Sequence, residues 1–521
     1  MSAHSLRLVS VTDTSIANLT AHLEASAAGG VRSTTPVINP FTGKRIYELP
    51  QLEADQVEMA AQLLRSSQPA WAALAPGRRA AILLAVFDQL LANQDKLMDV
   101  LQLETGKSHA HAFEEVSGAI QAALYYGKRA AKILARERTK PGVPILTKTW
   151  VERVPLGVVG VITPWNYPLA LTMLDVLPAL AAGNSVVQKA DNQTALTVLF
   201  ARHLAVEAGI PEGAWTVVVG GGAEVGNAIT DNADYVAFTG STATGRLVAE
   251  RAAKRLIGYS LELGGKNPMI VLEGANLKRA AELALAGAFG SAGQLCVSLE
   301  RVYVPNHQKD AFIAELASRA RSLAVGHSKD FRMDMGTLAG QAQLDRVSGF
   351  VDQAVASGAT VVSGGHALPE LGPYFYAPTV VTDVTSSADL YRKEVFGPLL
   401  DVEGYDTIES AIDLANDTEY GLNASVVGPK REALRVASKL MAGSVNINEG
   451  FRATFASMES PMGGMKSSGK GRRNGVEGLL RFTESRTVGI ASGLLRLPLR
   501  GKDYDRMAPM MVAMMKFLRR F

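Results

Sequence analysis

Cysteine is almost absent from this sequence, since Cys296 is the only one among 521 residues. A single cysteine cannot form an internal disulfide, so nothing in the chain requires an oxidising compartment. An excess of one charge is also missing, because 53 basic and 50 acidic side chains leave a formal net charge of +3. A balance so close to neutral argues against a nucleic-acid-binding protein.

Long apolar runs and clusters of metal ligands are missing as well. No charge-free apolar run reaches the roughly 18 residues of a membrane-spanning helix. The start of the sequence, "MSAHSLRLVSVTDTSIANLT", has no continuous apolar stretch of the kind found in a signal peptide. His109 and His111 are two apart, which places them on different faces of a helix. We therefore expect a cytoplasmic protein without a metal site.

The chain is too long for one hydrophobic core, and two or three domains are expected. Residues 55–140 show apolar side chains three and four apart, which predicts helices. From residue 157, short apolar runs alternate with helical segments, as in a doubly wound α/β domain. Buried parallel strands are predicted for "GVVGVIT", "NSVVQK", "AWTVVVG" and "DYVAFTG".

A second α/β pattern begins with "MIVL" after Pro268 and predicts another domain, to which Cys296 belongs. Its predicted helices include "KRAAELALAGAFGSAG", and its predicted strands are "RVYV", "ATVVSG" and "NASVVG". Outside both domains, "TKTWVERVP" and "LLRFTESRTVGI" alternate polar and apolar residues. These two segments predict a pair of edge strands that could form an arm between subunits.

The end of the chain, "RMAPMMVAMMKFLRRF", is apolar, rich in methionine and basic. A helix of this composition could lie on a membrane surface. It could also cover a pocket mouth or a subunit interface, because methionine adapts to irregular surfaces. Of the two, we favour packing against protein.

Three polar segments follow predicted strands: "TPWNYP", "KADN" and "TGSTATG". Parallel strands bring their carboxyl ends to one edge of a sheet, where ligands bind. "TGSTATG" does not match the Gly-x-Gly-x-x-Gly dinucleotide pattern. A strand that ends before a helix nevertheless offers free amides to a phosphate. The alternative is an ordinary strand-to-helix turn.

Cys296 follows the glycine-containing turn in "AGQLC", and Glu262 lies between leucines in "LELGGKNP". Free amides around an exposed thiol would lower its pKa and hold an oxyanion, whereas the alternative is an inert core thiol. An apolar setting would raise the pKa of Glu262 toward that of a general base, the alternative being a solvent-facing carboxylate. A cofactor-independent cysteine hydrolase, with His307 as partner of the thiol, is a different class that these residues leave open. A non-catalytic dinucleotide-binding scaffold is a third.

Together with "KEVFGP", "NDTEYGLNASV" and "SPMGGMKSSG", these segments resemble the aldehyde dehydrogenase superfamily in order and spacing, from about residue 35 to residue 490. "TPWNYPLALT", "ELGGKNPMIV", "GANL" and "GLLRFTES" are most similar to NADP-dependent succinate-semialdehyde dehydrogenases of an actinobacterial branch. The resemblance implies an α/β fold with a Rossmann-type dinucleotide-binding domain (residues 1–141 and 157–266) and an α/β catalytic domain (267–450). It also implies a β arm for oligomerisation (142–156 and 479–495), followed here by a Met-rich basic tail (496–521).

The resemblance also implies roles for individual residues. Cys296 is similar to the nucleophile that adds to the aldehyde carbon. Asn166 is similar to the side-chain donor of the oxyanion hole. Glu262 is similar to the base that activates water for hydrolysis of the thioester. With the cofactor supplying the remaining chemistry, one thiol is sufficient.

The implied cofactor is NADP, with NAD as the alternative. The family usually has Lys-Pro-Ser-Glu or Lys-Pro-Ala-Glu where this sequence has "KADN", so Asn192 replaces a glutamate that holds the ribose hydroxyls. A carboxylate there would repel a 2′-phosphate, whereas an amide could donate to one and Lys189 adds positive charge. The other implied contacts are Trp165, Gly240, Ser241, Leu263, Glu394 and Phe396.

The implied substrate is succinate semialdehyde, which is oxidised to succinate. Many such enzymes carry an arginine six residues before the nucleophile, where this sequence has Gly290, and Arg452 is the candidate replacement. The alternative for Arg452 is a surface role. Without a carboxylate anchor, medium- or long-chain aliphatic or aromatic aldehydes become the alternative substrates. The arm implies a homodimer or homotetramer.

Overall fold

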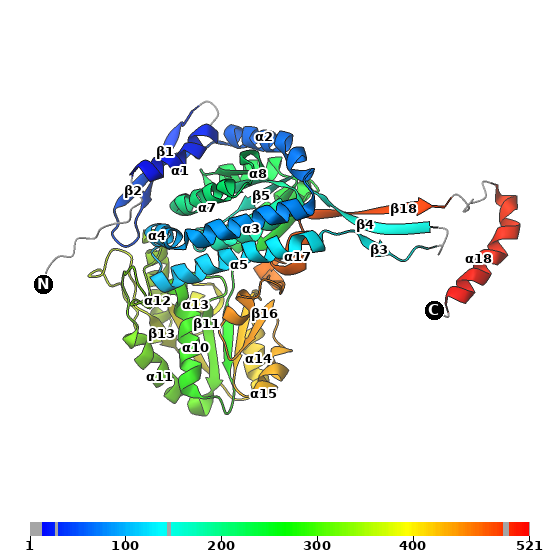
Figure 1. Cartoon of the computed structure of the whole chain (residues 1–521). Helices are drawn as coiled ribbons and strands as arrows, with labels where there is room; N and C mark the ends of the chain where they lie inside the picture. The colour runs from blue at the N-terminus through cyan, green and yellow to red at the C-terminus, as the bar shows by residue number, and fades with distance from the viewer. Residues whose placement is uncertain (1–12, 27–29, 143–146, 493–499, 520–521) are drawn as a thin grey trace. The chain divides into compact units, whose positions relative to one another are not determined.

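The computed structural model describes residues 13–26, 30–142, 147–492 and 500–519 (Figure 1). The chain divides into two compact units, Met1–Ile133 with Pro155–Thr483 and Leu134–Val154 with Glu484–Phe521. Some predicted parts lie outside the described residues. These are residues 1–12 and 27–29 of the dinucleotide-binding domain, 143–146 and 493–495 of the arm, and 496–499 and 520–521 of the tail.

The larger unit contains a six-stranded sheet with the order β17-β9-β8-β5-β6-β7. Its strands are β5 (Val158–Ile162), β6 (Ser185–Lys189), β7 (Trp215–Val218), β8 (Tyr235–Thr239), β9 (Gly258–Glu262) and β17 (Gly469–Lys470). All except β17 run parallel. Every residue of β5, β6 and β8 is buried, which explains their uninterrupted apolar sequences. The four strands predicted between residues 157 and 240 are confirmed.

The second sheet of this unit has seven strands in the order β12-β13-β14-β11-β10-β15-β16, of which only β12 is antiparallel. Its strands are β10 (Asn267–Val271), β11 (Leu299–Pro305), β12 (Thr360–Ser363), β13 (Thr379–Thr382), β14 (Leu399–Tyr405), β15 (Asn423–Val427) and β16 (Ser444–Ile447). Only residues 263–266 separate β9 from β10, so one short linker joins the two sheets. A two-stranded sheet of β1 (Ser33–Ile38) and β2 (Arg45–Gln51) precedes them.

The helices of the larger unit cover these sheets, and Figure 1 shows α10 and α11 beside the strands of the second sheet. They are α1 (Asp13–Ser26), α2 (Ala54–Ala72), α3 (Pro76–Ala92), α4 (Gln94–Thr105), α5 (His109–Ile133), α6 (Pro168–Ala182), α7 (Ala195–Glu207), α8 (Gly222–Asn232), α9 (Thr242–Lys254), α10 (Leu277–Phe289), α11 (Lys309–Ser322), α12 (Gln341–Ala356), α13 (Asp389–Arg392), α14 (Ile408–Asn416), α15 (Lys430–Ala437), α16 (Arg452–Phe455) and α17 (Gly475–Leu480).

Helix α6 shows how the sequence sets the limits of an element. Pro168 occupies the first turn, where its missing N–H costs nothing, and Gly183 ends the helix with φ of 98°. All 15 residues of α6 are buried, so this helix has no polar face. The residues just before it, "TPWNY", are thereby fixed at the end of β5.

The smaller unit contains a three-stranded sheet with the order β18-β4-β3. Its strands are β3 (Glu137–Thr139), β4 (Thr147–Pro155) and β18 (Thr483–Ala491), followed by α18 (Tyr504–Leu518). The helical prediction for 55–140 is wrong at its end, because residues 137–139 pair with β4 as a strand. The side chains of Met510, Val512 and Met515 on α18 are exposed.

Among the described residues, no single helix has the length and apolar character needed to cross a membrane. The consecutive helices α2 and α3, bent by 111° at their junction, meet that test of length and composition only when they are taken together.

Candidate active site

A pocket lies at the carboxyl ends of β5, β8 and β9, where the parallel strands of the six-stranded sheet end together. The second α/β part of the chain also contributes lining residues, which come from α12 and from the segments just before β11 and β14. The lining includes nine of the residues named from the sequence, namely Trp165, Asn166, Gly240, Ser241, Glu262, Leu263, Cys296, Glu394 and Phe396.

The turn before Cys296 is left-handed. The sequence predicted a helix through residue 293, but α10 ends at Phe289 because Ser291, Ala292 and Gly293 have φ of 49°, 54° and 70°. Left-handed backbone costs an L-residue about 1–2 kcal/mol, so this turn is held by its surroundings. Only glycine fits at position 293, since a Cβ there would collide with the carbonyl oxygen of Gly397.

The linker between the two sheets packs directly against this turn. A Cβ on Gly265 would lie 2.8 Å from the carbonyl oxygen of Cys296, and one on Gly264 would lie 2.5 Å from Glu394 Oε2. The Gly265 amide donates to Glu394 Oε1 at 2.8 Å. The paired glycines of "LGGK" therefore allow Cys296 and Glu394 to approach the same piece of backbone.

A buried ion pair fixes the loop that carries Glu394. Lys266 Nζ lies 2.7 Å from Glu300 Oε2, and both side chains are almost fully buried. Glu300 also accepts hydrogen bonds from the amides of Val395 and Phe396 at 2.9 and 3.0 Å. Charge-assisted hydrogen bonds in a dry interior hold a loop firmly. Phe396, with φ of 59°, is thereby placed edge-on against Trp165, with ring centroids 5.6 Å apart.

Asn166 is held from two directions. Its Nδ2 donates to the Gln294 carbonyl at 2.9 Å, and its own carbonyl accepts from Lys107 Nζ at 2.8 Å. Lys107 is buried in an ion pair with Glu115. Glu115 in turn accepts from the amide of Leu169 at 2.8 Å, in the first turn of α6. The Asn166 amide therefore faces the cysteine turn from a rigid support.

Glu262 and Cys296 have strongly perturbed acidities. Burial raises the pKa of Glu262 to about 7, although Arg473 and Arg481 oppose the shift. Glu262 Oε1 is buried and has no hydrogen-bond partner among the described residues. Burial, followed by the charges of Glu262 and Glu394, raises the pKa of Cys296 to about 12. The expectation that free amides lower the pKa of this thiol is therefore wrong for the free protein, because burial and two carboxylates outweigh them.

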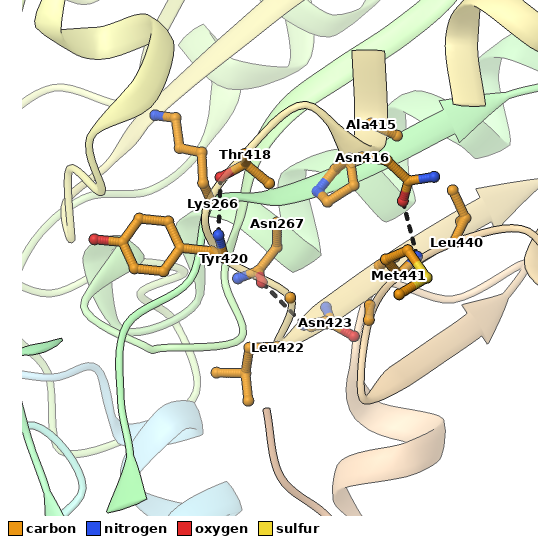
Figure 2. Close-up of a pocket in the computed structure, with 14 residues that line it drawn as sticks. Lys266, Asn267, Ala415, Asn416, Thr418, Tyr420, Leu422, Asn423, Leu440 and Met441 are labelled. Carbon is orange, nitrogen blue, oxygen red and sulfur yellow. Dashed lines mark hydrogen bonds between the residues drawn. The ribbon is translucent and has the colours of Figure 1, made fainter. Parts of the chain in front are cut away.

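A second small pocket is lined by Lys266 and Asn267 together with residues from 415–424 and 440–442 (Figure 2). Figure 2 shows the side chain of Asn267 pointing to Asn423, whose backbone amide donates to Asn267 Oδ1 at 3.0 Å. Asn267 Nδ2 donates to the carbonyl oxygens of Cys296 and Ser298 at 2.8 and 2.7 Å. These bonds connect the segments "GKNP" and "GLNASV" to the cysteine segment.

Lys189 and Asn192 do not line the pocket. Burial lowers the pKa of Lys189, and its Nζ donates to the Ala190 carbonyl at 3.3 Å. Asn192 Nδ2 donates to Gln51 Oε1 at 2.9 Å, while its Oδ1 accepts from the Gly220 amide at 3.1 Å. Both ends of the Asn192 amide are thus engaged within the protein.

Arg452 lies outside this pocket, in a neighbouring one. It forms an ion pair with Glu114 at 3.0 Å, and both side chains are about one-third exposed. The neighbouring pocket is otherwise mostly apolar and includes Phe113, Gly118, Tyr167, Phe451, Phe455, Ala456 and Met458. His307, the possible hydrolase partner, is exposed and lies 3.7 Å from Glu273. No histidine lines the Cys296 pocket among the described residues.

The aldehyde dehydrogenase family model matches residues 27–488 of the sequence, nearly nine-tenths of the chain. The chain belongs to the aldehyde dehydrogenase family. The match ends before α18.

Two similar aldehyde dehydrogenase relatives come from mycobacteria. A Mycolicibacterium smegmatis protein named "Putative succinate-semialdehyde dehydrogenase (NADP+)" is 48% identical over 88% of this chain and 89% of its own. A Mycobacterium tuberculosis protein of the same name, numbered 2, is 45% identical over the same shares of the two chains.

Solved structures share the fold. An Escherichia coli NADP-dependent enzyme aligns with a TM-score of 0.84 and 35% identity, over 88% of this chain and 95% of its own. Betaine aldehyde dehydrogenase from Staphylococcus aureus, in complex with NAD+, aligns with a TM-score of 0.86 and 31% identity, over 93% and 99%. The expected α/β aldehyde dehydrogenase fold is confirmed.

The structure adds lining residues that the sequence did not single out. Gln343 and Arg346 reach the pocket from α12, where they donate to the backbone carbonyls of Phe396 at 2.5 Å and Glu394 at 2.6 Å. Nothing in an ordinary surface helix distinguishes these two residues. Among the described residues, there is no cluster of three or more side chains suited to a metal ion.

We predict that Gly293→Ala lowers the free energy of unfolding by about 2–5 kcal/mol, the sum of left-handed strain and overpacking against Gly397. Urea unfolding measures the loss. Gly358→Ala is the matched control, because Gly358 also has a positive φ of 102° but has open space around it. Equal losses in the two variants would show that the contact with Gly397 is unimportant.

Proposed function

We propose that this protein oxidises an aldehyde to a carboxylic acid with NADP+ as the electron acceptor, and that succinate semialdehyde is its substrate. The observation that carries this proposal is the meeting of Cys296, Asn166 and an unpartnered Glu262 Oε1 in one pocket. A nucleophile, an amide donor and a base are the groups that thioester chemistry requires.

The Cys296 thiol is protonated in the free protein at neutral pH, so it must lose its proton before it reacts. Glu262 is a suitable acceptor, because its pKa of about 7 leaves a large fraction ionised. The thiolate then adds to the carbonyl carbon, and the charge that forms on the oxygen lies within reach of the Asn166 amide. Bound NADP+ would accept the hydride that this oxidation releases, and the substrate would then remain on Cys296 as a thioester.

Hydrolysis completes the reaction. Glu262 removes a proton from water, the resulting hydroxide attacks the thioester carbon, and the carboxylic acid leaves as Cys296 recovers its thiolate. The unpartnered Oε1 supports this role, since a carboxylate oxygen that is already bonded would be a poorer base. The same side chain takes a proton in both halves of the reaction, so Glu262 must pass the Cys296 proton to solvent before hydrolysis, and it releases the proton from water in the same way afterwards.

The pocket fits a dinucleotide at its other end. Ser241 caps the 13-residue helix α9 by accepting from the Thr244 amide, and the amides of this helix start face the pocket edge. A helix N-terminus is suited to a phosphate group. Trp165, Leu263, Glu394 and Phe396 would form the wall beside the nicotinamide. When bound, NADP+ supplies the hydride acceptor of the oxidation.

The preference for NADP+ is supported by the absence of a carboxylate at Asn192 and by the names of the mycobacterial relatives. The Asn192 amide is already bonded to Gln51 and Gly220. For the preference between NADP+ and NAD+, the absence of a negative charge on this side chain therefore matters more than its capacity to donate a hydrogen bond. Lys189, at the end of β6, adds a cation near the same strand end.

The neighbouring apolar pocket supports an aldehyde site on the side opposite the cofactor wall. Tyr167, Phe451 and Phe455 line this pocket and also pack in the apolar cluster that Cys296 joins. Arg452 at its edge is the candidate partner for the carboxylate of succinate semialdehyde. Its ion pair with Glu114 means that the substrate competes with a protein carboxylate.

The apolar lining also favours a second class of substrate, namely unsubstituted aliphatic or aromatic aldehydes. Five of the eleven lining residues of the pocket are aromatic or methionine: Phe113, Tyr167, Phe451, Phe455 and Met458. Burying an apolar chain here needs no charged anchor.

For assembly we propose a homodimer or homotetramer formed through the β3-β4-β18 sheet. Strand β18 is a nine-residue edge strand with mostly exposed residues, and an open edge of this length pairs readily with a second copy.

We expect Cys296→Ala to abolish NADPH formation while it retains NADP+ binding, because the thiol makes the covalent bond and little of the binding surface. Glu262→Gln should lose steady-state turnover by at least about 100-fold, since hydrolysis loses its base. Stopped-flow absorbance at 340 nm and cofactor titration measure the two effects. Full activity of either variant would remove that residue from the mechanism.

Asn192→Glu should lower kcat/KM for NADP+ relative to NAD+ by about tenfold, because a carboxylate repels the 2′-phosphate. Steady-state kinetics with both cofactors measures this ratio. Asn192→Gln is the matched control, with the same side-chain length as glutamate and no charge. If both variants change the ratio equally, charge at this position does not select the cofactor.

Arg452→Gln should lower kcat/KM for succinate semialdehyde by about tenfold, because it removes a charge-assisted contact made by a side chain that is about one-third exposed. Butanal is the control substrate, because it has four carbons without the carboxylate and should be unaffected. Glu114→Gln should raise kcat/KM for succinate semialdehyde by freeing Arg452. A wild-type preference for butanal, with no effect of either substitution, would favour the apolar class of substrates.

A further inference from the structure

Three charged side chains form a buried cluster beside the six-stranded sheet. Arg473 Nε and Nη2 donate to the two carboxylate oxygens of Asp175 at 2.9 and 2.6 Å. Arg481 donates to the same carboxylate and to Ser260 Oγ, the latter at 2.9 Å. Asp175 is fully buried and Arg473 is 1% exposed.

The charges in this cluster do not balance. Two guanidinium groups share one carboxylate, so the cluster carries one surplus positive charge away from water. A surplus charge in the interior is costly unless a group of opposite charge lies nearby. No local sequence pattern indicates the cluster, because α6 supplies Asp175 and the segment after β17 supplies Arg473.

The cluster lies next to Glu262. Arg473 Nη2 donates to Thr239 Oγ1 at 2.7 Å, and Thr239 is the residue opposite Glu262 in the β8–β9 register. Strand β17, which leads to Arg473, pairs with β9 so that Gly469 lies opposite Glu262. Ser260, bonded to Arg481, is on the same strand as Glu262. Strands β8, β9 and β17 thus connect the cluster to the Glu262 carboxylate.

We propose that the Asp175–Arg473–Arg481 cluster is an electrostatic positioning element for Glu262, whose surplus positive charge keeps the Glu262 carboxylate ionised and available as a base. This inference rests on the proposed function of Glu262. None of the three residues lines the Cys296 pocket, so the cluster acts on Glu262 through its field.

The charges around Glu262 agree with this role. Arg473 and Arg481 lower the pKa of Glu262 and Asp175 raises it, against the larger effect of burial. Arg473 also lowers the pKa of Cys296. The titratable groups that act on or face Glu262 are Asp175, Tyr235, Cys296, Arg472, Arg473 and Arg481.

Opposite charge changes within the cluster provide the test. Arg473→Gln removes positive charge, so the acidic limb of the kcat–pH profile for aldehyde oxidation should move up by about one pH unit. Asp175→Asn removes negative charge with no change of shape, so that limb should move down. Arg473→Lys keeps the charge and should restore the wild-type profile. Shifts of the same sign in Arg473→Gln and Asp175→Asn, or no shift in either, would overturn the inference.

A second readout separates this inference from the proposed function. Alkylation of Cys296 by iodoacetamide needs neither aldehyde nor cofactor, and its pH profile should move up in Arg473→Gln. If that shift occurs in a protein with no aldehyde oxidation, the proposed function fails while the field of the cluster is retained. If aldehyde oxidation is normal and both pH profiles are unmoved, the inference fails. Should Arg473→Gln not fold, the kcat–pH shift of Asp175→Asn alone decides, because a shift down supports the inference and no shift overturns it.

Discussion

The close approach of two backbone segments, the linker 263–266 and the turn 291–296, is the constraint on which the site depends. Two glycines in the linker and one in the turn remove the Cβ atoms that would separate these segments from Glu394, Gly397 and the Cys296 carbonyl. The linker also joins β9 of the six-stranded sheet to β10 of the seven-stranded sheet. The contact between the linker and the turn therefore helps to place the ends of these two strands relative to each other. The groups proposed as base and nucleophile are therefore placed by backbone packing.

Buried ion pairs then support the pocket at three points. Lys266 with Glu300 holds the loop of Glu394, Lys107 with Glu115 holds the backbone of Asn166, and the Asp175 cluster lies beside Glu262. In each pair the charged groups also form hydrogen bonds with backbone or side-chain partners. These additional hydrogen bonds reduce the cost of burying the charges. The dry surroundings that strengthen these pairs also raise the pKa of Glu262 to about 7 and that of Cys296 to about 12.

Four strands of each sheet and most site positions could be predicted from the sequence, because buried strands are continuous apolar runs and their ends are marked by polar segments. "GVVGVIT" and "DYVAFTG" illustrate this relation, since β5 and β8 end within a residue of them. The left-handed turn at 291–293 was missed because serine and alanine do not signal positive φ. Arg473 was missed because its partner is 298 residues away and a buried arginine has no local signature. Asn192 and Arg452 were identified by charge alone, and the sequence could not show that Gln51 and Glu114 already bind them.

The isolation of Cys296 has a consequence for chemical durability. Oxidants react with the thiolate, and the high pKa of this thiol leaves little thiolate in the free protein at neutral pH. The resting thiol is therefore protected against peroxide until a base or a bound ligand changes its surroundings. Once a sulfenic acid does form, no second cysteine in the chain can capture it as an internal disulfide, so recovery depends on small thiols from outside.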